Sequence, residues 1–274
     1  MDELVSVVVP TRNNERTIER CLQSVRDQTY TAVELIVVDN SSTDGTVEIA
    51  RRLADVVVTA GPERSAQRNR GLELAGGRWF LWLDSDMVLP PDAVSAAVRS
   101  AEQQGAAGVA LPERTIGEGY WTACRALERA CYLDDEWLHN PRLLRRDYLR
   151  DLGGFDVGMS GPEDTDLRLR ILARGDTIAL APVVVDHDEG RLTVGDVMRK
   201  RYYYGWSIPE FASHHGGGVR SQGAAVVGSY VRHRRRLLAS PGHALGMVAL
   251  RTMEAAAYAA GALSGIRGRR VDRT

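Results

Sequence analysis

The chain has 274 residues, of which 44% are hydrophobic and 26% are charged, so it can bury a sizeable core as an ordinary soluble globular protein. Its three scattered cysteines, Cys21, Cys124 and Cys131, form no C-x-x-C pair, which argues against a zinc site or a disulfide framework and favours buried free thiols. No run approaches the roughly 18 apolar residues of a membrane span, and the N-terminus lacks the features of a signal peptide, so we expect a cytoplasmic protein, with a peripheral position at the inner face of the membrane left open.

The net charge of -1 conceals an uneven distribution. The segment from Arg191 to the end carries 14 basic and 4 acidic residues, whereas the first 190 residues carry 21 basic and 32 acidic residues. A basic C-terminal segment after an acidic body suggests a surface that faces phosphates, either of lipid headgroups or of nucleic acid.

The first 86 residues alternate between strand and helix patterns. Apolar runs rich in β-branched or aromatic residues predict buried strands at residues 5–10, 34–39, 55–59 and 79–84. Helical spacing and capping residues predict helices at residues 15–26, from the turn 40–45 through 53, and 65–75. This order predicts an α/β fold with a mostly parallel central sheet and helices on both faces.

Polar residues follow each of the four predicted strands, namely Thr11 to Asn13, Asp39, Gly61 to Arg64, and Asp84 to Asp86. In open α/β sheets the carboxyl ends of the strands form the ligand-binding edge, so these residues predict a nucleotide site. Asp84 and Asp86 suit Mg²⁺ or Mn²⁺ that carries a phosphorylated ligand; the alternative is a solvated loop. The chain lacks both G-x-G-x-x-G and G-x-x-x-x-G-K-[ST], which argues against a dinucleotide-binding Rossmann domain and a P-loop.

The second half gives weaker signals. It predicts helices at about 91–104, within 120–137 and at 163–173, and strands at 108–111 and 178–186. The last strand ends at Asp186-His187-Asp188. Glu163 and Asp164 open the 163–173 helix, where the helix dipole alone would favour two acids.

The C-terminal segment contains a basic block at residues 232–236, preceded by a predicted hinge at Gly216–Gly218. Residues 243–264 are rich in Ala, Leu, Met and Gly but include Arg251 and Glu254. They can lie on a membrane surface, or form a helix hairpin that packs on the body or on a second subunit. Nucleic-acid binding is disfavoured, because no matching motif accompanies the arginines.

Six segments together resemble the family 2 glycosyltransferases of the GT-A fold. They are Val7–Asn13, Val37–Thr46, Arg68–Gly71, Leu83–Asp86, Gly153–Phe155 and Glu163–Asp164. The resemblance covers residues 4 to about 205, and residues 199–205 resemble the basic-aromatic stretch that follows the catalytic domain in this family. It implies a GT-A catalytic domain at 1–205, with a nucleotide-binding half at 1–110 and an acceptor-binding half at 111–205, and a helical basic extension at 206–274.

The same resemblance implies an inverting transfer of a sugar from a nucleotide-diphospho donor to an acceptor hydroxyl. It assigns nucleotide binding to Pro10, Thr11, Arg12, Asn13, Asp39, Arg68, Asp84 and Ser85. It assigns a divalent metal, Mn²⁺ or Mg²⁺, to Asp86, Asp84 and His187, although His187 can equally be a structural hydrogen-bonding residue. Asp164 matches the catalytic base and Glu163 would orient the acceptor. Asp39 resembles the carboxylate that accepts from the ring N–H of the base, so a UDP-sugar is the first expectation and a dTDP-sugar the second.

Two other functions are weighed. A nucleotidyltransferase that makes the activated sugar would need a Gly-rich basic loop after the first strand, unlike residues 11–14. A non-catalytic nucleotide-sugar-binding subunit of a membrane assembly would not need Asp84, Asp86 and Asp164. The acceptor is left open between a lipid-linked glycan, a secondary metabolite and a peptide. Membrane-surface contact through the basic segment and a homo-oligomer are both left open, and nucleic acid is not expected as a partner.

Overall fold

The structure is a computed structural model that describes residues 2–215 and 218–271. Part of the predicted hinge, residues 216 and 217, lies outside the described residues. The chain divides into two compact units. Unit 1 comprises Met1–Glu113, His139–Val157 and Leu167–Asp188, and unit 2 comprises Arg114–Leu138, Gly158–Asp166 and Glu189–Thr274. These units interleave along the chain and do not test the predicted domain boundaries, which stay predictions.

Unit 1 is built on a seven-stranded sheet of order β3-β2-β1-β4-β8-β6-β9. Its strands are β1 (Val5–Thr11), β2 (Val33–Asp39), β3 (Val56–Thr59), β4 (Trp79–Trp82), β6 (Gly108–Ala110), β8 (Pro141–Arg145) and β9 (Ile178–Leu180). The first four in chain order run parallel, whereas β8 is antiparallel to both β4 and β6. The predicted mostly parallel sheet is therefore confirmed.

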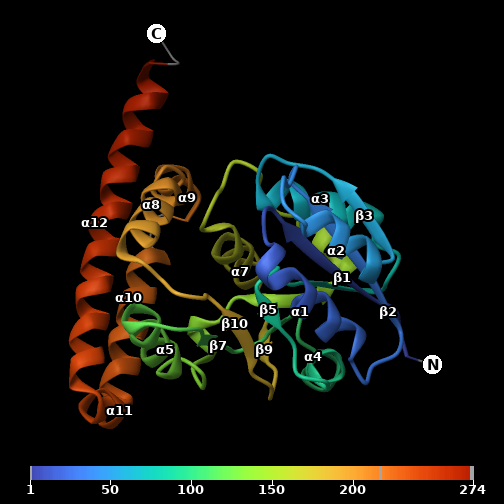
Figure 1. Cartoon of the computed structure of the whole chain (residues 1–274), viewed down its shortest axis with the longest axis horizontal. Coiled ribbons are helices and arrows are strands. Elements are labelled where there is room, and N and C mark those ends of the chain that lie inside the picture. Colours follow the sequence, from blue (N-terminus) through green and yellow to red (C-terminus); the bar gives the residue numbers. More distant parts are fainter. Residues whose placement is uncertain (1, 216–217, 272–274) are drawn as a thin grey trace. The chain divides into compact units, whose positions relative to one another are not determined.

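Helices cover both faces of this sheet (Figure 1). They include α1 (Glu15–Arg26), α2 (Thr46–Leu53), α3 (Arg64–Leu74), α4 (Ala93–Gln104) and α6 (Arg146–Asp151). Successive residues of β1 point to opposite faces, so Val7 and Val9 join one buried cluster and Val8 joins the other. Burial on both faces explains why these strands are continuous apolar runs.

A short antiparallel pair extends unit 1. Strand β5 (Met87–Val88) pairs with β10 (Val185–Asp188), and His187 lies opposite Met87 in the register. This pairing brings His187 next to the loop that follows β4. Strand β7 (Glu113–Ile116) and helix α7 (Glu163–Ala173) each cross the boundary between the units along the chain.

Unit 2 is helical apart from β7. Its elements are α5 (Tyr120–Ala130), the 3₁₀ helix η1 (Glu136–Leu138), α8 (Val194–Gly205), α9 (Ile208–His215), α10 (Gly218–Arg232), α11 (Arg234–Ala239) and α12 (Pro241–Val271). Helix α12 packs along α8 and α5. Residues 243–264 lie within this continuous 31-residue helix, so they do not themselves form a hairpin, which was one of the two alternatives left open. Over the described residues, no helix is both long and apolar enough to cross a bilayer.

Glycines let α12 approach its neighbours closely. A methyl group at Gly246 would collide with Tyr120 and Cys124 of α5, and one at Gly261 would collide with the carbonyl of Tyr202 in α8. At Gly265 a Cβ atom would lie 2.8 Å from the carbonyl oxygen of Trp206. The glycines that weaken the helix signal in the sequence are therefore sites of backbone contact.

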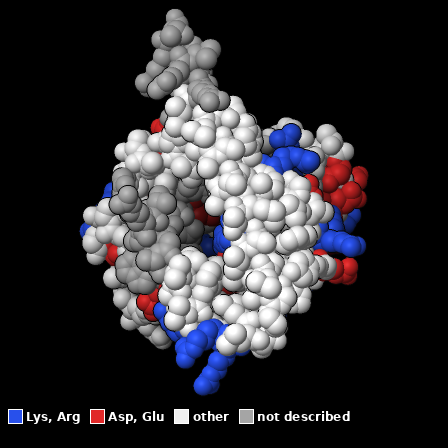
Figure 2. All heavy atoms as spheres, turned by 90° about the vertical axis from the view of Figure 1, so that its left-hand side faces the viewer, with Lys and Arg blue, Asp and Glu red and all other residues white. Residues whose placement is uncertain are grey.

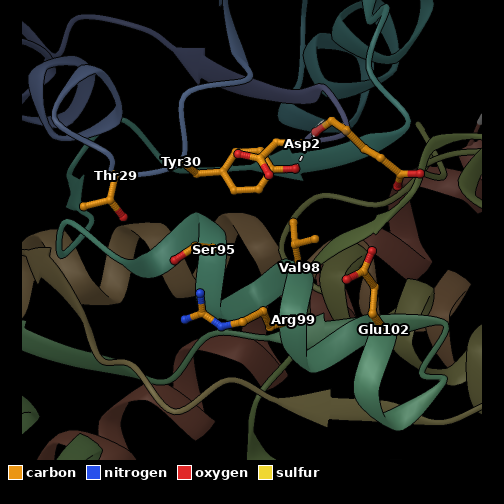
Figure 3. Close-up of a pocket in the computed structure, with 8 residues that line it drawn as sticks. Asp2, Thr29, Tyr30, Ser95, Val98, Arg99 and Glu102 are labelled. Carbon is orange, nitrogen blue, oxygen red and sulfur yellow. Dashed lines mark hydrogen bonds between the residues drawn. The ribbon is translucent and has the colours of Figure 1, made fainter.

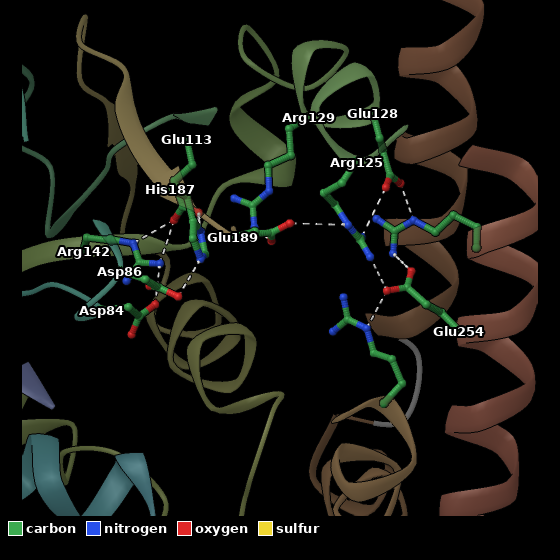
Figure 4. A network of polar contacts seen from close by, with 12 residues as sticks. Asp84, Asp86, Glu113, Arg125, Glu128, Arg129, Arg142, His187, Glu189 and Glu254 are labelled. Carbon is green, nitrogen blue, oxygen red and sulfur yellow. Dashed lines mark hydrogen bonds and ion pairs between the residues drawn. The ribbon is translucent and has the colours of Figure 1, made fainter. Parts of the chain in front are cut away.

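A buried ionic cluster fixes the inward face of α12 (Figure 4). Glu254 is 2% exposed and accepts from Arg125, from Arg201 at 2.7 Å and from Arg251 at 3.2 Å. Burial alone would raise the pKa of Glu254, but the three guanidinium groups lower it to about 2. The cluster continues to Glu128 of α5, which accepts from Arg125 and Arg251.

Candidate functional site

The carboxyl ends of the four parallel strands meet at one edge of the sheet. Thr11 at the end of β1 is in register with Asp39 of β2, and Asp39 is in register with Thr59 of β3. Val8 of β1 is in register with Trp82, the last residue of β4. The predicted convergence of the polar strand ends is observed within unit 1.

Two of these loops hold each other in place. Asn13 has a left-handed backbone with φ of 50°, donates its N–H to Ser42 Oγ at 2.8 Å and accepts from the N–H of Thr43 at 2.8 Å. Asp39 is buried and accepts from the N–H of Ser42 at 2.9 Å and from its hydroxyl. In this structure the Asp39 carboxylate thus shapes the turn after β2.

The end of β1 presents both a buried and an exposed group to this edge. Pro10 and Thr11 are buried, whereas Arg12 is exposed. The hydroxyl of Thr11 has no hydrogen-bond partner within the part of the chain that the structure describes. Buried polar groups are usually paired, so such an atom at a ligand-binding edge is a candidate contact.

Asp84 lies between two arginines. Its Oδ1 is 2.9 Å from Arg68 Nη2, and its Oδ2 is 3.2 Å from Arg142 Nη2. Burial would raise the pKa of Asp84, but the charges of Arg142 and Arg68, with smaller contributions from Arg64 and His187, hold it well below its usual range. Asp84 is therefore ionised and engaged on both oxygens.

A chain of polar contacts leads from Arg142 to Asp86 (Figure 4). Arg142 Nη2 is 2.6 Å from Glu113 Oε1, and Glu113 Oε2 is 3.1 Å from His187 Nδ1. The other ring nitrogen of His187, Nε2, is 3.4 Å from Asp86 Oδ2. Glu113 is paired with an arginine and so can only accept, which means that His187 Nδ1 carries a proton; in the neutral form of the ring, Nε2 would then carry the lone pair.

Asp86 has a buried oxygen that no described residue satisfies. Its Oδ1 is buried and has no hydrogen-bond partner among the described residues, and its Oδ2 lies 3.4 Å from His187 Nε2. With the imidazole neutral, Asp86 Oδ2 and His187 Nε2 are both acceptors, and a cation placed between them would stabilise the pair. A search of residues 2–215 and 218–271 finds no group of three or more His, Cys, Asp or Glu side chains arranged to hold a metal. Asp86 and His187 therefore fit part of a metal site, to which a bound ligand would add oxygens.

The Gly153-Gly154-Phe155 turn is fastened to α3. The side chain of Asn69 donates to the carbonyl of Phe155 and accepts from its N–H, both at 2.8 Å. Gly154 has φ of +70°, and a Cβ atom there would lie 2.6 Å from Asn69 Oδ1. This clasp places the ring of Phe155 against Trp82, with centroids 5.0 Å apart, and 5.3 Å from the Arg68 guanidinium. The turn therefore positions Arg68 beside Asp84.

The remaining predicted site residues occupy different settings. Ser85 is buried and its hydroxyl accepts from Asn14 Nδ2 at 2.5 Å. Glu163 and Asp164 form the first turn of α7, in the part that belongs to unit 2. Glu163 is buried and accepts from the N–H of Gly161 at 2.5 Å, whereas Asp164 is half-exposed.

A hollow elsewhere on unit 1 does not coincide with this edge. It has a volume of about 500 Å³ and is lined by residues that include Asp2, Glu3, Tyr30, Arg99 and Glu102 (Figure 3). Asp2 and Glu3 precede β1, so the hollow lies at the amino-terminal edge of the sheet. Three acids and one arginine give it no complementarity to a phosphorylated ligand.

Sequence reasoning missed Glu113, Arg142 and Asn14. Glu113 follows β6 and could have been found by the rule that singled out Asp39, namely a polar residue just after a predicted strand. Arg142 stands out as a charge in the apolar run Pro141–Arg145, but that strand was not predicted. Nothing in the sequence marks Asn14 as the partner of Ser85.

A mostly parallel α/β sheet with these polar groups at its carboxyl edge is the arrangement typical of nucleotide-binding proteins. Residues 6–160 match the pattern of Glycosyl transferase family 2, and the chain therefore belongs to that family.

Curated relatives agree with this membership. The succinoglycan biosynthesis protein ExoA of Rhizobium meliloti is 30% identical over 196 residues, which cover 62% of this chain and 59% of ExoA. The putative glycosyltransferase EpsH of Bacillus subtilis is 34% identical over 103 residues, 35% of this chain and 30% of EpsH. The chain thus spans less than two thirds of the length of these relatives.

Solved structures share the fold. A mannosyltransferase from Pyrobaculum calidifontis, PcManGT, in complex with GDP-Man and Mn²⁺ aligns with a TM-score of 0.62 at 21% identity, over 97% of this chain and 88% of that one. Residues 1–349 of S. aureus TarS in complex with UDP-GlcNAc align with a TM-score of 0.53 at 18% identity, over 74% of this chain and 65% of that one. At these identities the likeness supports the GT-A-type fold alone.

Proposed function

We propose that the protein transfers a sugar from a nucleotide-diphospho donor to an acceptor hydroxyl, with inversion at the anomeric carbon and with help from a divalent metal. The observation that carries the proposal is the unsatisfied Asp86 Oδ1 beside His187 Nε2, at the carboxyl edge of a family 2 glycosyltransferase sheet.

The donor would bind at that edge through residues of unit 1. Asp86 and His187 would hold Mn²⁺ or Mg²⁺, which when bound would stabilise the negative charge that develops on the leaving diphosphate. Asp84 was also a predicted ligand, but both of its oxygens are engaged by guanidinium groups. We therefore assign Asp84 to holding Arg68 and Arg142 in place beside the nucleotide.

Asp164 is the proposed proton acceptor. An inverting displacement needs a base on the side opposite the leaving group to remove the acceptor proton. Asp164 is half-exposed at the first turn of α7, where the helix dipole favours a carboxylate. Glu163 is buried and bonded to Gly161, which suits it to hold this turn and the acceptor in position.

A uracil or thymine base is proposed for the donor. Asp39 ends β2 at the expected position, and it would have to share its oxygens between Ser42 and the ring N–H of the base. Thr11, Arg12 and Asn13 would complete the pocket. UDP-sugars come first, with dTDP-sugars second; the bound TarS and PcManGT ligands carry different bases, so those structures do not decide between nucleotides.

The test is release of nucleoside diphosphate by the full chain from UDP-, dTDP- and GDP-sugars with Mn²⁺, with and without EDTA. We expect slow, metal-dependent release from a UDP-sugar. Release of pyrophosphate from a nucleoside triphosphate and a sugar phosphate would indicate a nucleotidyltransferase. Donor binding without any release would indicate a non-catalytic binding subunit.

Asp164→Asn sharpens this test. We expect it to lower transfer by about 10²- to 10⁴-fold, the usual contribution of general base catalysis, while the midpoint of thermal unfolding shifts with added UDP-sugar and Mn²⁺ as in the wild type. Near-normal turnover in this variant would remove Asp164 from the mechanism.

A further inference from the structure

The outward face of α12 carries no charge over most of its described length. Between Leu245 and Ile266, ten residues of this helix are exposed: Leu245, Val248, Ala249, Thr252, Ala255, Ala256, Ala259, Ala260, Leu263 and Ile266. Only Thr252 among them is polar. This stretch is about 30 Å long at the rise of an α-helix. Leu245 is 73% exposed and Leu263 is 60% exposed, so the face is open rather than partly covered.

Helix α12 cannot rotate about its own axis to bury this apolar face. Gly246, Gly261 and Gly265 lie against backbone or side chains of α5 and α8. Glu254 is buried among three arginines. Rotating α12 would break this buried ionic cluster, so the apolar side is held outward.

Arginines stand at one end of the apolar face. Arg234–Arg236 form the start of α11 and are exposed, and Leu238 of the same helix is 75% exposed. Helix α11 lies at the N-terminal end of α12 (Figure 1). Figure 2 looks onto this side of unit 2 and shows a broad uncharged surface with Lys and Arg side chains at its lower edge.

Aromatic and basic residues of α8, together with Trp206 directly after it, flank the other end. Tyr202 donates its hydroxyl to Ser264 of α12 at 3.0 Å, and Trp206 lies against Gly265. Tyr202 and Trp206 are 40% and 48% exposed. Arg199 and Lys200, also in α8, are exposed. Tyrosine, tryptophan and basic residues around an apolar stripe are the composition of helices that lie in a membrane interface.

Charge decides between a bilayer and a second copy of the chain. Two copies that paired their α12 faces in parallel would bring the Arg234–Arg236 blocks together. Antiparallel pairing would bring each block to the Arg199–Lys200 end of the partner, which is also basic. Between Gly218 and Val271 the sequence holds one acidic residue, the buried Glu254. Anionic headgroups complement both ends, whereas the acids that a second copy carries near these ends, Asp134, Asp135 and Asp196, are already paired with His233, Arg232 and Arg199 of their own chain.

We propose that the outward face of α12, together with Arg234–Arg236 of α11, binds the surface of a bilayer that contains anionic lipids. The helix would lie in the plane of the interface, with its apolar residues at the level of the acyl chains and the arginines at the headgroups. This inference does not rest on the proposed transfer reaction, and it would place an acceptor carried by a lipid within reach of the same surface.

The test is flotation of the full chain with vesicles of phosphatidylcholine alone and of phosphatidylcholine mixed with phosphatidylglycerol. We expect binding to the mixed vesicles that weakens as salt is raised. Replacing Arg234–Arg236 by Gln should weaken partition on the order of 100-fold, at about fivefold for each arginine. Leu245→Asp with Val248→Asp should weaken it by at least about tenfold, because both side chains would lose their burial in the acyl region.

Matched variants of unit 1 provide the controls. Arg51, Arg52 and Arg99 are exposed and can be replaced by Gln together, and Val157, which is 62% exposed, can be replaced by Asp. Both control variants should bind vesicles as the wild type does, and circular dichroism should show unchanged helix content in all variants.

Three results would overturn the proposal. One is no binding of the wild type to the mixed vesicles. Another is equal binding by the α11 or α12 variants and the wild type. The third is a wild-type dimer in sedimentation that becomes a monomer in the Leu245→Asp, Val248→Asp variant without any vesicle binding, which would assign this face to a second copy.

Discussion

Each of the two units contains a buried network of carboxylates and arginines, and the two networks differ in how their central carboxylates are paired. In unit 2 both oxygens of Glu128 and of Glu254 accept hydrogen bonds or ion pairs from arginines and tyrosines. In unit 1 the chain of contacts through Asp84 and Glu113 ends at Asp86, whose Oδ1 has no partner within the described part of the chain.

This difference distinguishes charged groups that stabilise the fold from charged groups that bind a ligand. Removing one member of a fully paired buried network leaves uncompensated charge and destabilises the fold. A buried oxygen without a partner costs stability in the free protein and is retained where a ligand satisfies it. The unit 2 network is thus expected to control folding, and the unit 1 network to control binding.

Asp86→Asn gives the largest expected effect. It removes the negative charge that faces the proposed cation, so release of nucleoside diphosphate should fall by about 10³-fold. The free energy of unfolding without metal should change by less than about 1 kcal/mol, because no partner of Oδ1 is lost. Binding of Mn²⁺ in the presence of nucleoside diphosphate, followed by electron paramagnetic resonance, and urea unfolding measure the two effects.

Asp92→Asn is the matched control, since Asp92 is exposed on unit 1 and its side chain makes no capping hydrogen bond. It should leave both measurements unchanged. Wild-type Mn²⁺ affinity in Asp86→Asn would remove this residue from the metal site.

Glu254→Gln should show the opposite behaviour. It removes the carboxylate that pairs with Arg201 and leaves Arg125 and Arg251 with Glu128 as counter-charge in a buried cluster, so we expect a loss of about 3–5 kcal/mol in the free energy of unfolding. Mn²⁺ affinity of the remaining folded protein should be unchanged. Glu48→Gln, at an exposed position of α2, should cost less than about 0.5 kcal/mol. An unfolding midpoint equal to that of the wild type would show that the closed network is not needed for folding.

The pH dependence of stability tests the same cluster without removing it. The pKa of Glu254 is lowered from 4.5 to about 2 in the folded chain. A lowered folded pKa contributes stability above the unfolded pKa, and this contribution is lost as the pH falls from about 5 to about 2. The shift corresponds to roughly 3 kcal/mol. Unfolding free energy measured across this window should fall less steeply in Glu254→Gln than in the wild type, and equal slopes would contradict the assignment.

Glu113→Gln should give the smallest effect. An amide in place of the carboxylate can donate to His187 Nδ1, so the tautomer with its lone pair on Nε2 is no longer enforced. Loss of such a supporting hydrogen bond typically lowers metal affinity by about 10- to 100-fold. Nitrogen chemical shifts of His187 should report a single tautomer in the wild type and a mixture in the variant, and an unchanged tautomer would show that Glu113 does not fix the ring.

The first four strands could be predicted because each is a short apolar run buried on both faces and followed by polar residues. The predicted edge at Thr11, Asp39 and Asp84 to Asp86 follows from the same pattern. The strand Pro141–Arg145 could not be predicted, because Arg142 and Arg145 interrupt its apolar pattern and its pairing with β4 is antiparallel. The pattern of a parallel sheet gives no expectation for such a strand.

Two features, one in the candidate site and one in α12, could not be predicted because they depend on contacts between distant parts of the chain. Glu113 meets His187 only because β10 pairs beside the loop after β4. For residues 243–264 the sequence left a membrane-surface segment and a helix hairpin open, and the close approach of Gly246 and Gly261 to α5 and α8 within one continuous helix is a tertiary effect.

The glycines of α12 also fix the rotation of the helix about its own axis. A slip by one residue would turn it by about 100° about its own axis, moving Gly246, Gly261 and Gly265 away from their contacts and driving bulkier side chains into the backbone of α8. The contacts of α12 with α5 and α8 therefore permit only one rotational orientation of this helix. Substitutions on the exposed face of α12 do not change the orientation of the helix. The binding preference of that face can therefore diverge while the packing of α12 against α5 and α8 stays the same.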